Sequence, residues 1–527
     1  MTVQTSFTQD VAPIFIQGLQ AKTIAMLLVF MGLSWWVYGV LYNIYFHPLR
    51  GVPGPRIAAI SNIPYCVWLL SGRMPYKLLE LHDRYGHAVR TAPNEVSFSS
   101  AQSWADIYGV RPGHKTFIKG NFYDGGSFAG IGTASIISER KPEAHRNMRD
   151  YLSNAFSDRA ITKQEATVAS LVDRFIQRVG ELGSQRESLN MMTRLQSLTF
   201  DITGSLSLGA SFGALERDKP HPWISISINA MMQGEIIDVL NRFPILLKVV
   251  PVVMARKLKT LTEDTKKNEQ FAFKAVQSRM ARQAESEDFL TRILEDRDPT
   301  VVTDRQIAAH ASDLVIAGSD TTATVLSALI YYLLLNPTSM SRLTAEIRDG
   351  FRKYEDINNL STAPLQYLRV CLLESMRIYP PVPMSLPRVV PDGGDTVDGI
   401  FLPGGTTVYT SPIAASLGKA NFRDPMSFNP ERWIKRNEGD DLDASQPFSV
   451  GVRACIGRNL AWMDMRTTLV KLLWVYDLEL AQPIDWQAQS KMHTLWRKPD
   501  LMVRVKNRGV EVPSLVNPDI VLAREST

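Results

Sequence analysis

A helical pattern of unusual length places the strongest constraint on how this chain can fold. It begins at Thr303, with Gln306 three positions later as the partner in a capping box. It ends at Asn336, because Pro337 cannot continue the helix. At 1.5 Å per residue, about 33 residues span about 50 Å, longer than an ordinary globular helix. We therefore expect a helix that crosses the interior of a large domain.

Composition and pattern favour a single large domain, mainly α-helical with small β-sheets. The chain has 527 residues, of which 45% are hydrophobic and 21% charged, as in folded globular proteins. After residue 56 there is neither an internal repeat nor a low-complexity linker. Two segments alternate as hairpins do, residues 89 to 99 around Pro93 and Asn94, and residues 397 to 411 around Gly404 and Gly405.

Charge and cysteine content exclude several classes of protein. The net charge is +5, from 58 basic and 53 acidic residues without long Lys/Arg runs, so a nucleic-acid partner is not expected. The three cysteines, Cys66, Cys371 and Cys455, have no metal-type spacing. A disulfide framework or a zinc site is therefore not expected, and the folded part belongs in a reducing compartment.

Near the N-terminus, residues 23 to 46 contain no charged side chain. About 20 apolar residues suffice to cross a bilayer as a helix, and Trp35, Trp36 and Tyr45 are of the type enriched at membrane interfaces. A cleaved signal peptide is shorter and ends in a small-residue cleavage pattern, which is missing here. A buried core helix is the other alternative. We interpret the segment as a single-pass transmembrane anchor.

The anchor divides the chain into four predicted parts. Residues 1 to 22 form a short lumenal segment, 23 to 46 the anchor, 47 to 56 (HPLRGVPGPR) a proline-rich hinge, and 57 to 527 the folded domain. Arg50 and Arg56 follow the anchor, whereas only Asp10 and Lys22 precede it. This weak positive-inside bias predicts that the folded domain lies in the cytosol.

The motif AGSDTT, residues 317 to 322, lies inside the long helical pattern. A buried Asp320 needs partners or a raised pKa. Ala317 and Thr321 are four residues apart and share a helical face. Gly318 lacks a side chain, which leaves room for a small ligand and frees carbonyl groups. A buried helix with a satisfied threonine pair is the alternative, and this motif alone does not separate the two.

Glu374 and Arg377, in VCLLESMRIYPP, are three residues apart on one helical face. Most such pairs are solvated surface salt bridges that contribute little to the stability of the fold. Here apolar residues surround the pair, so we expect it to be buried, and a buried ion pair needs a further partner. Arg432, in FNPERW, is the candidate for that partner.

The segment FSVGVRACIG, which begins at Phe448, contains Cys455 between Gly451 and Gly457. As a metal ligand the cysteine must be a thiolate, and positive charge and backbone N–H groups lower the pKa of a thiol. The glycines would let the backbone fold tightly beneath a flat cofactor. Arg453 offers a fork of donors suited to a carboxylate. A buried structural cysteine is the alternative, and we prefer that interpretation for the other two cysteines.

Together these segments resemble the cytochrome P450 superfamily over nearly the whole chain after residue 23. FSVGVRACIG resembles its haem-binding signature, AGSDTT its oxygen-activation motif, and ESMR with FNPERW its structural Glu-Arg-Arg triad, in the same order. The resemblance implies the fold of that family, with haem b (iron protoporphyrin IX) between the long central helix and the cysteine loop.

The resemblance also implies roles for individual residues. Cys455 would be the axial thiolate, with Phe448 beside it excluding water. Thr321 and Asp320 would be catalytic, handling the protons that oxygen activation requires. The remaining cofactor-binding residues would be Arg453, Arg388 in SLPR, His145 and Arg149 in EAHRNMR, and Ala317 and Gly318.

The implied activity is that of a monooxygenase that inserts one oxygen atom from O2 into an apolar small molecule. A complete dinucleotide fingerprint is missing, since Ser135 replaces the last glycine of GGSFAGIGTAS. Electrons would therefore come from an NADPH-cytochrome P450 reductase carrying FAD and FMN, and from cytochrome b5, at the endoplasmic reticulum membrane. Two alternatives remain: a reductase-independent haem-thiolate isomerase or dehydratase, and a non-catalytic haem or lipid carrier.

The substrate class rests on weaker signals. Residues 223 to 254 are rich in Ile, Val and Met, which is compatible with the roof of an apolar pocket and equally with core packing. The segment YNIYFHPLRGVPGP resembles the anchors of fungal members that modify polyketides, terpenoids and alkaloids. Fungal secondary metabolism is therefore the expected setting, by analogy.

Overall fold

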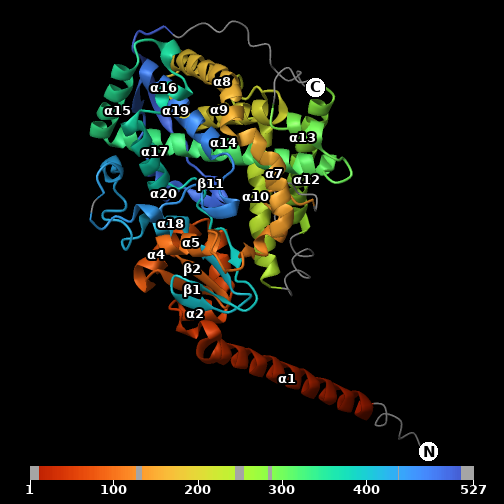
Figure 1. Cartoon of the computed structure of the whole chain (residues 1–527). Helices are drawn as coiled ribbons and strands as arrows, with labels where there is room; N and C mark the ends of the chain where they lie inside the picture. The colour runs from red at the N-terminus through yellow and green to blue at the C-terminus, as the bar shows by residue number, and fades with distance from the viewer. Residues whose placement is uncertain (1–10, 126–132, 244–254, 283–287, 437, 512–527) are drawn as a thin grey trace, which may run out of the picture.

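The computed structural model describes residues 11–125, 133–243, 255–282, 288–436 and 438–511. Most of these residues are helical, and the strands are short, which confirms the predicted mainly α fold with small sheets (Figure 1). Residues 1–10 of the predicted lumenal segment, 126–132 of the incomplete dinucleotide motif and 244–254 of the predicted pocket roof lie outside the described residues.

The helices pack around one interior, and strands β1 (Ala88–Ala92) and β2 (Glu95–Phe98) lie at the end from which α1 projects, whereas β11 (Leu495–Arg497) lies near the middle (Figure 1). They are α1 (Val11–Leu41), α2 (Arg56–Ile60), α3 (Ile63–Leu70), α4 (Met74–Tyr85), α5 (Ala101–Tyr108), α6 (Phe122–Gly125), α7 (Pro142–Ser153), α8 (Asp158–Gln185), α9 (Met191–Leu208), α10 (Pro222–Asn241), α12 (Ala255–Met280), α13 (Thr291–Asp296), α14 (Asp304–Leu335), α15 (Pro337–Gly350), α16 (Asn359–Thr362), α17 (Gln366–Ile378), α18 (Pro412–Leu417), α19 (Arg458–Val475) and α20 (Trp486–Gln489).

The strands of the described residues form four small sheets. They are β1 (Ala88–Ala92), β2 (Glu95–Phe98), β3 (Ile118–Lys119), β4 (Leu189–Asn190), β5 (Arg388–Val389), β6 (Asp395–Val397), β7 (Ile400–Leu402), β8 (Thr407–Thr410), β9 (Tyr476–Leu480), β10 (Lys491–His493), β11 (Leu495–Arg497) and β12 (Met502–Asn507). The largest sheet has the order β1-β2-β8-β5-β3, the next β4-β12-β9, and β6-β7 and β10-β11 are hairpins.

One predicted hairpin is confirmed and the other is wrong. β1 and β2 pair antiparallel across Pro93 and Asn94. The arms on either side of Gly404 and Gly405 do not pair with each other, because β7 pairs with β6 whereas β8 pairs with β2 and β5. The hairpin turn lies earlier, at Asp398 and Gly399, whose φ angles are 51° and 76°. Two consecutive positive φ values are what a tight two-residue hairpin turn requires.

The long helix α14 has the ends that the sequence predicts. Thr303 caps it by accepting a hydrogen bond from the backbone N–H of Gln306 at 3.3 Å, and Pro337 opens the next helix. α14 runs through the middle of the molecule and packs against α9 and α12 (Figure 1). Most of its side chains are buried on all sides. A helix that is apolar on all sides belongs to the core of a protein. The few accessible residues of α14 therefore mark places where the packing around it is interrupted.

The N-terminal helix is the opposite case. Residues Thr23–Phe46 form a candidate membrane span that is 0% buried, and α1 projects away from the rest of the chain (Figure 1). A π-helical turn, Tyr42–Phe46, extends α1. Among the described residues Asp304–Leu335 is also long and apolar enough to span, but it is 83% buried and is the core helix α14. The exposed apolar surface of the first segment fits the predicted anchor.

Three buried histidines predict that the fold loses stability in mild acid. Burial lowers the pKa of His82, His221 and His310 from 6.5 to about 4. As pH falls below 6.5, the unfolded chain therefore takes up protons that the folded chain does not. Stability should fall between pH 6.5 and 4 by about 1.4 kcal/mol per pH unit for each histidine. Denaturant unfolding at pH 7 and pH 5 measures this loss. His310→Gln should make the pH dependence shallower, and an unchanged dependence would contradict the assignment.

Candidate active site

The loop that carries Cys455 is held by backbone contacts. The Cys455 N–H donates to the carbonyl of Phe448 at 2.9 Å, which closes the loop on itself. Gly451 has a φ of +75°, and a Cβ at this residue would lie 2.0 Å from the carbonyl oxygen of Tyr108. Only glycine can therefore occupy position 451, because the loop presses against the end of α5.

The Cys455 side chain is accessible although other groups of the protein surround it. It is solvent-accessible, yet the protein around it raises the pKa of the thiol by desolvation. The N–H of Gly457 and the charges of Arg149 and Arg458 act in the other direction. The predicted lowering of the thiol pKa is thus outweighed by burial. A metal ion that coordinates the sulfur would remove the proton.

Three residues of the AGSDTT motif interrupt the buried surface of α14. Ala317, Gly318 and Thr321 are partly accessible within a helix whose neighbouring positions are mostly buried. The Thr321 hydroxyl donates to the Ala317 carbonyl at 2.6 Å, so both residues lie on one face. The space beside Gly318 differs from the prediction. A Cβ there would lie 2.8 Å from Oγ1 of Thr203, so this space is taken by α9 and not by a ligand.

A cluster of buried and half-buried cations lies near the cysteine loop. Burial and the charge of Arg388 lower the pKa of Arg453 to about 10. Burial, Arg453 and Arg388 lower the pKa of Lys119 well below its usual value. The Arg453 guanidinium donates to the backbone carbonyls of Glu139 and Arg140 at 2.8 and 3.1 Å. Lys119 was missed by sequence reasoning, because a lone lysine in a short strand carries no pattern.

The other predicted cofactor-binding residues belong to the same cluster. Arg388 is buried in β5, and its guanidinium lies 5.1 Å from the centre of the Tyr108 ring. Arg149 donates to the Ala454 carbonyl at 2.9 Å, which joins α7 to the cysteine loop. Burial, with the charges of Arg453 and Lys119, lowers the pKa of His145 to about 3, so its imidazole is neutral.

The donor set fits an anionic, planar cofactor that bears carboxylates. Buried cations that repel one another are costly unless an anion neutralises them, and a haem carries two propionates. Within the described residues no group of three or more His, Cys, Asp or Glu side chains can hold a metal ion. In a haem site Cys455 would be a protein ligand of a metal that the macrocycle otherwise holds.

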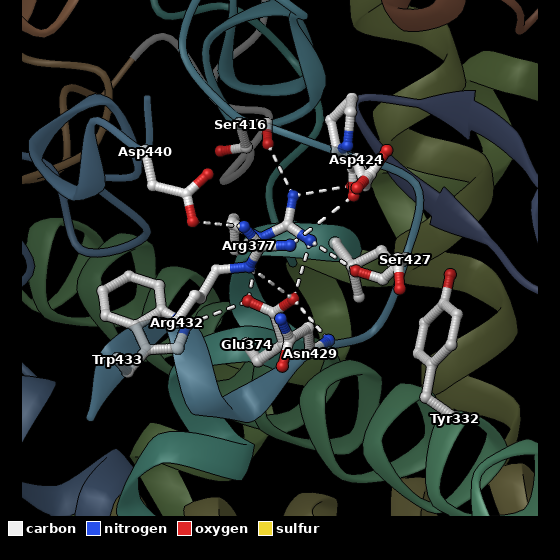
Figure 2. A network of polar contacts seen from close by, with 12 residues as sticks. Tyr332, Glu374, Arg377, Ser416, Asp424, Ser427, Asn429, Arg432, Trp433 and Asp440 are labelled. Atoms are coloured by element: carbon white, nitrogen blue, oxygen red, sulfur yellow. Dashed lines mark hydrogen bonds and ion pairs between the residues drawn. The ribbon is translucent and has the colours of Figure 1, made fainter. Parts of the chain in front are cut away.

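The predicted Glu-Arg-Arg triad is assembled and buried (Figure 2). Glu374 accepts two hydrogen bonds from Arg377, each 2.8 Å long, and one from Arg432 at 3.1 Å. The side chains of Glu374 and Arg377 are both 0% exposed. Arg377 also donates to the carbonyls of Ser416, Pro425 and Ser427, which lie on the segment leading to the cysteine loop.

Two further members of this network were not predicted. Asp440 forms an ion pair with Arg432 at 2.6 Å, and the Trp433 indole donates to Glu374 at 2.9 Å (Figure 2). With Asp440 the buried network contains two anions, Glu374 and Asp440, and two cations, Arg377 and Arg432. That balance makes the burial tolerable, since each charge has a hydrogen-bonded partner.

Asp320 has partners, as the sequence requires of a buried carboxylate. Its Oδ1 accepts from Lys498 at 2.6 Å and from Gln196 at 3.0 Å. Lys498 is 2% exposed and also donates to the Thr324 hydroxyl at 2.8 Å. The carboxylate therefore engages Lys498, which was not predicted, and it is not hydrogen-bonded to Thr321 in this structure.

Fold and site together fit the haem-thiolate class of proteins, in which a single cysteine is the protein ligand of haem iron. The family model described as cytochrome P450 matches residues 53–504. The chain therefore belongs to the cytochrome P450 family and is one of its monooxygenases.

Relatives in fungi support this assignment. The chain is 49% identical over 434 residues to cytochrome P450 monooxygenase ORF11 of Penicillium roqueforti, which covers 82% of this chain and 90% of that protein. It is 41% identical to cytochrome P450 monooxygenase BipB of Cochliobolus sativus over 88% of this chain and 94% of the relative. It is 37% identical to cytochrome P450 monooxygenase astJ of Aspergillus oryzae over 91% of this chain and 96% of the relative.

The two glycines of the cysteine loop should differ in their tolerance of a methyl group. Gly451→Ala should destabilise the protein by more than about 2 kcal/mol, because a positive φ and a clash with Tyr108 combine. Gly457→Ala is the matched control, since the nearest neighbouring atom would be 3.7 Å away, on Phe156. Thermal unfolding and haem content of both variants measure the difference. Equal losses in both variants would contradict the assigned role of Gly451.

Proposed function

We propose that the protein is a membrane-anchored haem-thiolate monooxygenase that inserts one oxygen atom from O2 into an apolar small molecule. The single observation that carries this proposal is the accessible Cys455 sulfur in a protein interior whose central helix exposes Ala317 and Thr321. Hydroxylation, epoxidation and multi-step oxidation all fit this chemistry.

In the proposed reaction Cys455 would hold the iron as a thiolate ligand, which would supply electron density to the metal. Arg453, Arg388 and Arg149, with neutral His145, lie among the groups that would hold the propionates, and Lys119 adds a further cation. Haem bound there would supply the redox chemistry that activates molecular oxygen. Phe448, partly buried beside the loop, would limit the access of water to the sulfur.

Thr321 and Asp320 would handle protons on the side of α14. The Thr321 hydroxyl lies on the accessible face, and while its proton is donated to the Ala317 carbonyl its oxygen can still accept a hydrogen bond. To pass on a proton, the hydroxyl would turn away from that carbonyl and release its own proton as it takes up another. For Asp320 to deliver a proton to that face, its carboxylate must leave Lys498 or act through water. If it leaves, Lys498 keeps the Thr324 hydroxyl as a partner.

Electrons would come from outside the chain. An NADPH-cytochrome P450 reductase carrying FAD and FMN, with cytochrome b5 as a second donor, fits a chain without a complete dinucleotide fingerprint. Such partners would dock on the cysteine side, steered by basic residues.

The proposed setting is fungal secondary metabolism at the endoplasmic reticulum. The fungal relatives, each named a cytochrome P450 monooxygenase, support the setting. Substrates of the polyketide, terpenoid or alkaloid type would suit an apolar pocket. The exposed apolar helix at Thr23–Phe46 supports a single-pass anchor with the catalytic domain in the cytosol.

Membrane attachment predicts a simple fractionation result. The full chain should remain in the membrane pellet after alkaline carbonate extraction, whereas a chain that begins at residue 47 should be released, because a spanning helix resists extraction. Immunoblots of pellet and supernatant measure the distribution. Full release of the intact chain would contradict a spanning anchor.

Replacing Thr321 should separate electron consumption from product formation. Thr321→Ala should leave NADPH consumption within about threefold of wild type while product per NADPH falls at least about tenfold and hydrogen peroxide rises, since proton handling typically contributes 10²–10⁴-fold. The ratio of product formed to NADPH consumed is measured with the enzyme reconstituted with reductase and a substrate that the wild type oxidises. Thr322→Ala is the matched control, because Thr322 is buried on another side of α14.

If Thr321→Ala keeps the wild-type ratio of product to NADPH, the residue has no role in proton handling. Product formation without O2 and NADPH would instead favour a reductase-independent haem-thiolate enzyme. Absence of any turnover, with haem bound, would favour a carrier.

A further inference from the structure

Three polar side chains at the C-terminal end of α10 reach neighbouring elements. Glu235 and Asp238 belong to α10 and Arg242 directly follows its last residue; they are spaced by three and four residues, so they lie along one face. α10 packs along α12 and also contacts α3, α6 and β10. This face therefore joins the end of α10 to β2, to α3 and to the β10-β11 hairpin.

Arg242 is the centre of the first contact. Its guanidinium forms ion pairs with Glu95 of β2 at 3.0 Å and with Asp238 at 3.1 Å. It also lies 3.5 Å from the centre of the Tyr65 ring, on α3, and donates to Asn62 at 3.4 Å. The Glu95 side chain is 5% exposed and that of Arg242 17%. A cation over a ring and beside a buried carboxylate is held strongly in a geometry of this kind.

Glu235 makes a second contact about two turns earlier on α10. Its carboxylate accepts from the N–H of Thr494 at 2.6 Å and lies 3.1 Å from the imidazole of His493. Thr494 is the tip of the β10-β11 hairpin and has a φ of +65°. A non-glycine residue in that conformation costs free energy, so the bond to Glu235 fixes the position of the hairpin tip.

A narrow cavity lies beside the Arg242 contact. Tyr65 and Tyr409 are part of its lining, and so is Pro387, which precedes the haem-site residue Arg388. The other lining side chains are mostly apolar and include Leu69, Met74, Leu78, Phe122, Met384 and Met492. The cavity holds about 20 Å³, which is room for little more than one water molecule. A polyketide- or terpenoid-sized molecule can pass only if these walls separate.

We propose that Arg242 is a clasp that keeps this passage closed, and that a substrate enters when Arg242 leaves Glu95 and Tyr65. Asp238 lies in the last turn of α10, four residues before Arg242, and would move with it, so the guanidinium keeps one charged partner in the open state. This gives α10 two discrete arrangements instead of a continuous deformation. The proposal rests on the proposed function for the nature of the molecule that enters.

The clasp predicts that large haem ligands bind and leave faster when it is broken. Clotrimazole, whose azole nitrogen binds haem iron and shifts its absorption, serves as the large probe, and imidazole as the small one. In Arg242→Met and in Glu95→Gln, stopped-flow association and dissociation rate constants for clotrimazole should both rise at least about tenfold. The rate constants for imidazole should stay within about twofold. The double variant should be no faster than Arg242→Met alone, because Arg242→Met already removes the contact with Glu95.

Two controls separate the clasp from general damage. Arg348→Met removes an ion pair with Asp477 from an arginine of similar exposure on α15, and it should leave clotrimazole kinetics unchanged. Glu95→Gln preserves the size of the side chain, so a folded variant is available if Arg242→Met fails to fold. Unchanged clotrimazole rates in folded Glu95→Gln would overturn the proposal. A rise in the imidazole rates equal to that for clotrimazole would also overturn it.

Hydrogen exchange keeps the test independent of the proposed function. In Arg242→Met and Glu95→Gln, peptides covering Pro222–Asn241 should exchange faster than in the wild type, whereas peptides from the middle of α8 should not change. This measurement needs no haem, so it still tests the clasp if the chain binds no haem or oxidises no substrate. Wild-type exchange in α10 of both variants would overturn the proposal.

Discussion

The buried carboxylate of Glu374 is the interaction on which the geometry of the site depends. It is fully buried and accepts hydrogen bonds from Arg377, Arg432 and Trp433. A single unpaired charge in this interior would be prohibitively costly, so every partner must be in place when the chain folds. Because Arg377 also binds carbonyls between residues 416 and 427, the network fixes the segment that leads to the cysteine loop.

Close packing and charged side chains then position the cysteine loop that follows this segment. Gly451 fits against Tyr108 only because it lacks a side chain, and this contact sets where the loop presents Cys455. Arg149 ties the loop to α7, while Arg453 reaches across to the segment at residues 139 and 140. The result is a rigid support for one sulfur atom, with buried cations positioned for an anionic ligand. At the periphery, polar contacts of Glu235 and Arg242 join the end of α10 to the β10-β11 hairpin and to β2.

Sequence reasoning succeeded where the physics is local. Thr303 as the capping residue and Pro337 predicted both ends of α14. The i, i+3 spacing of Glu374 and Arg377 predicted their ion pair. It failed where two interacting residues are far apart in the sequence, and where backbone φ angles determine the position of a turn. Lys498 is 178 residues from Asp320 in the chain, so no local pattern could pair them. The space beside Gly318 goes to Thr203 of another helix, and the turn at Asp398 and Gly399 was overlooked in favour of a glycine pair nearby.

The central claim is that the sulfur of Cys455 is the axial ligand of haem iron. The most direct measurement is the carbon monoxide difference spectrum of the reduced protein, for the wild type and for Cys455→Ser. Thiolate ligation moves the haem band strongly to the red, so the wild type should show that band and the serine variant should lose it while the other motifs remain intact. An identical red-shifted band in the serine variant would contradict the assignment of Cys455 as the ligand.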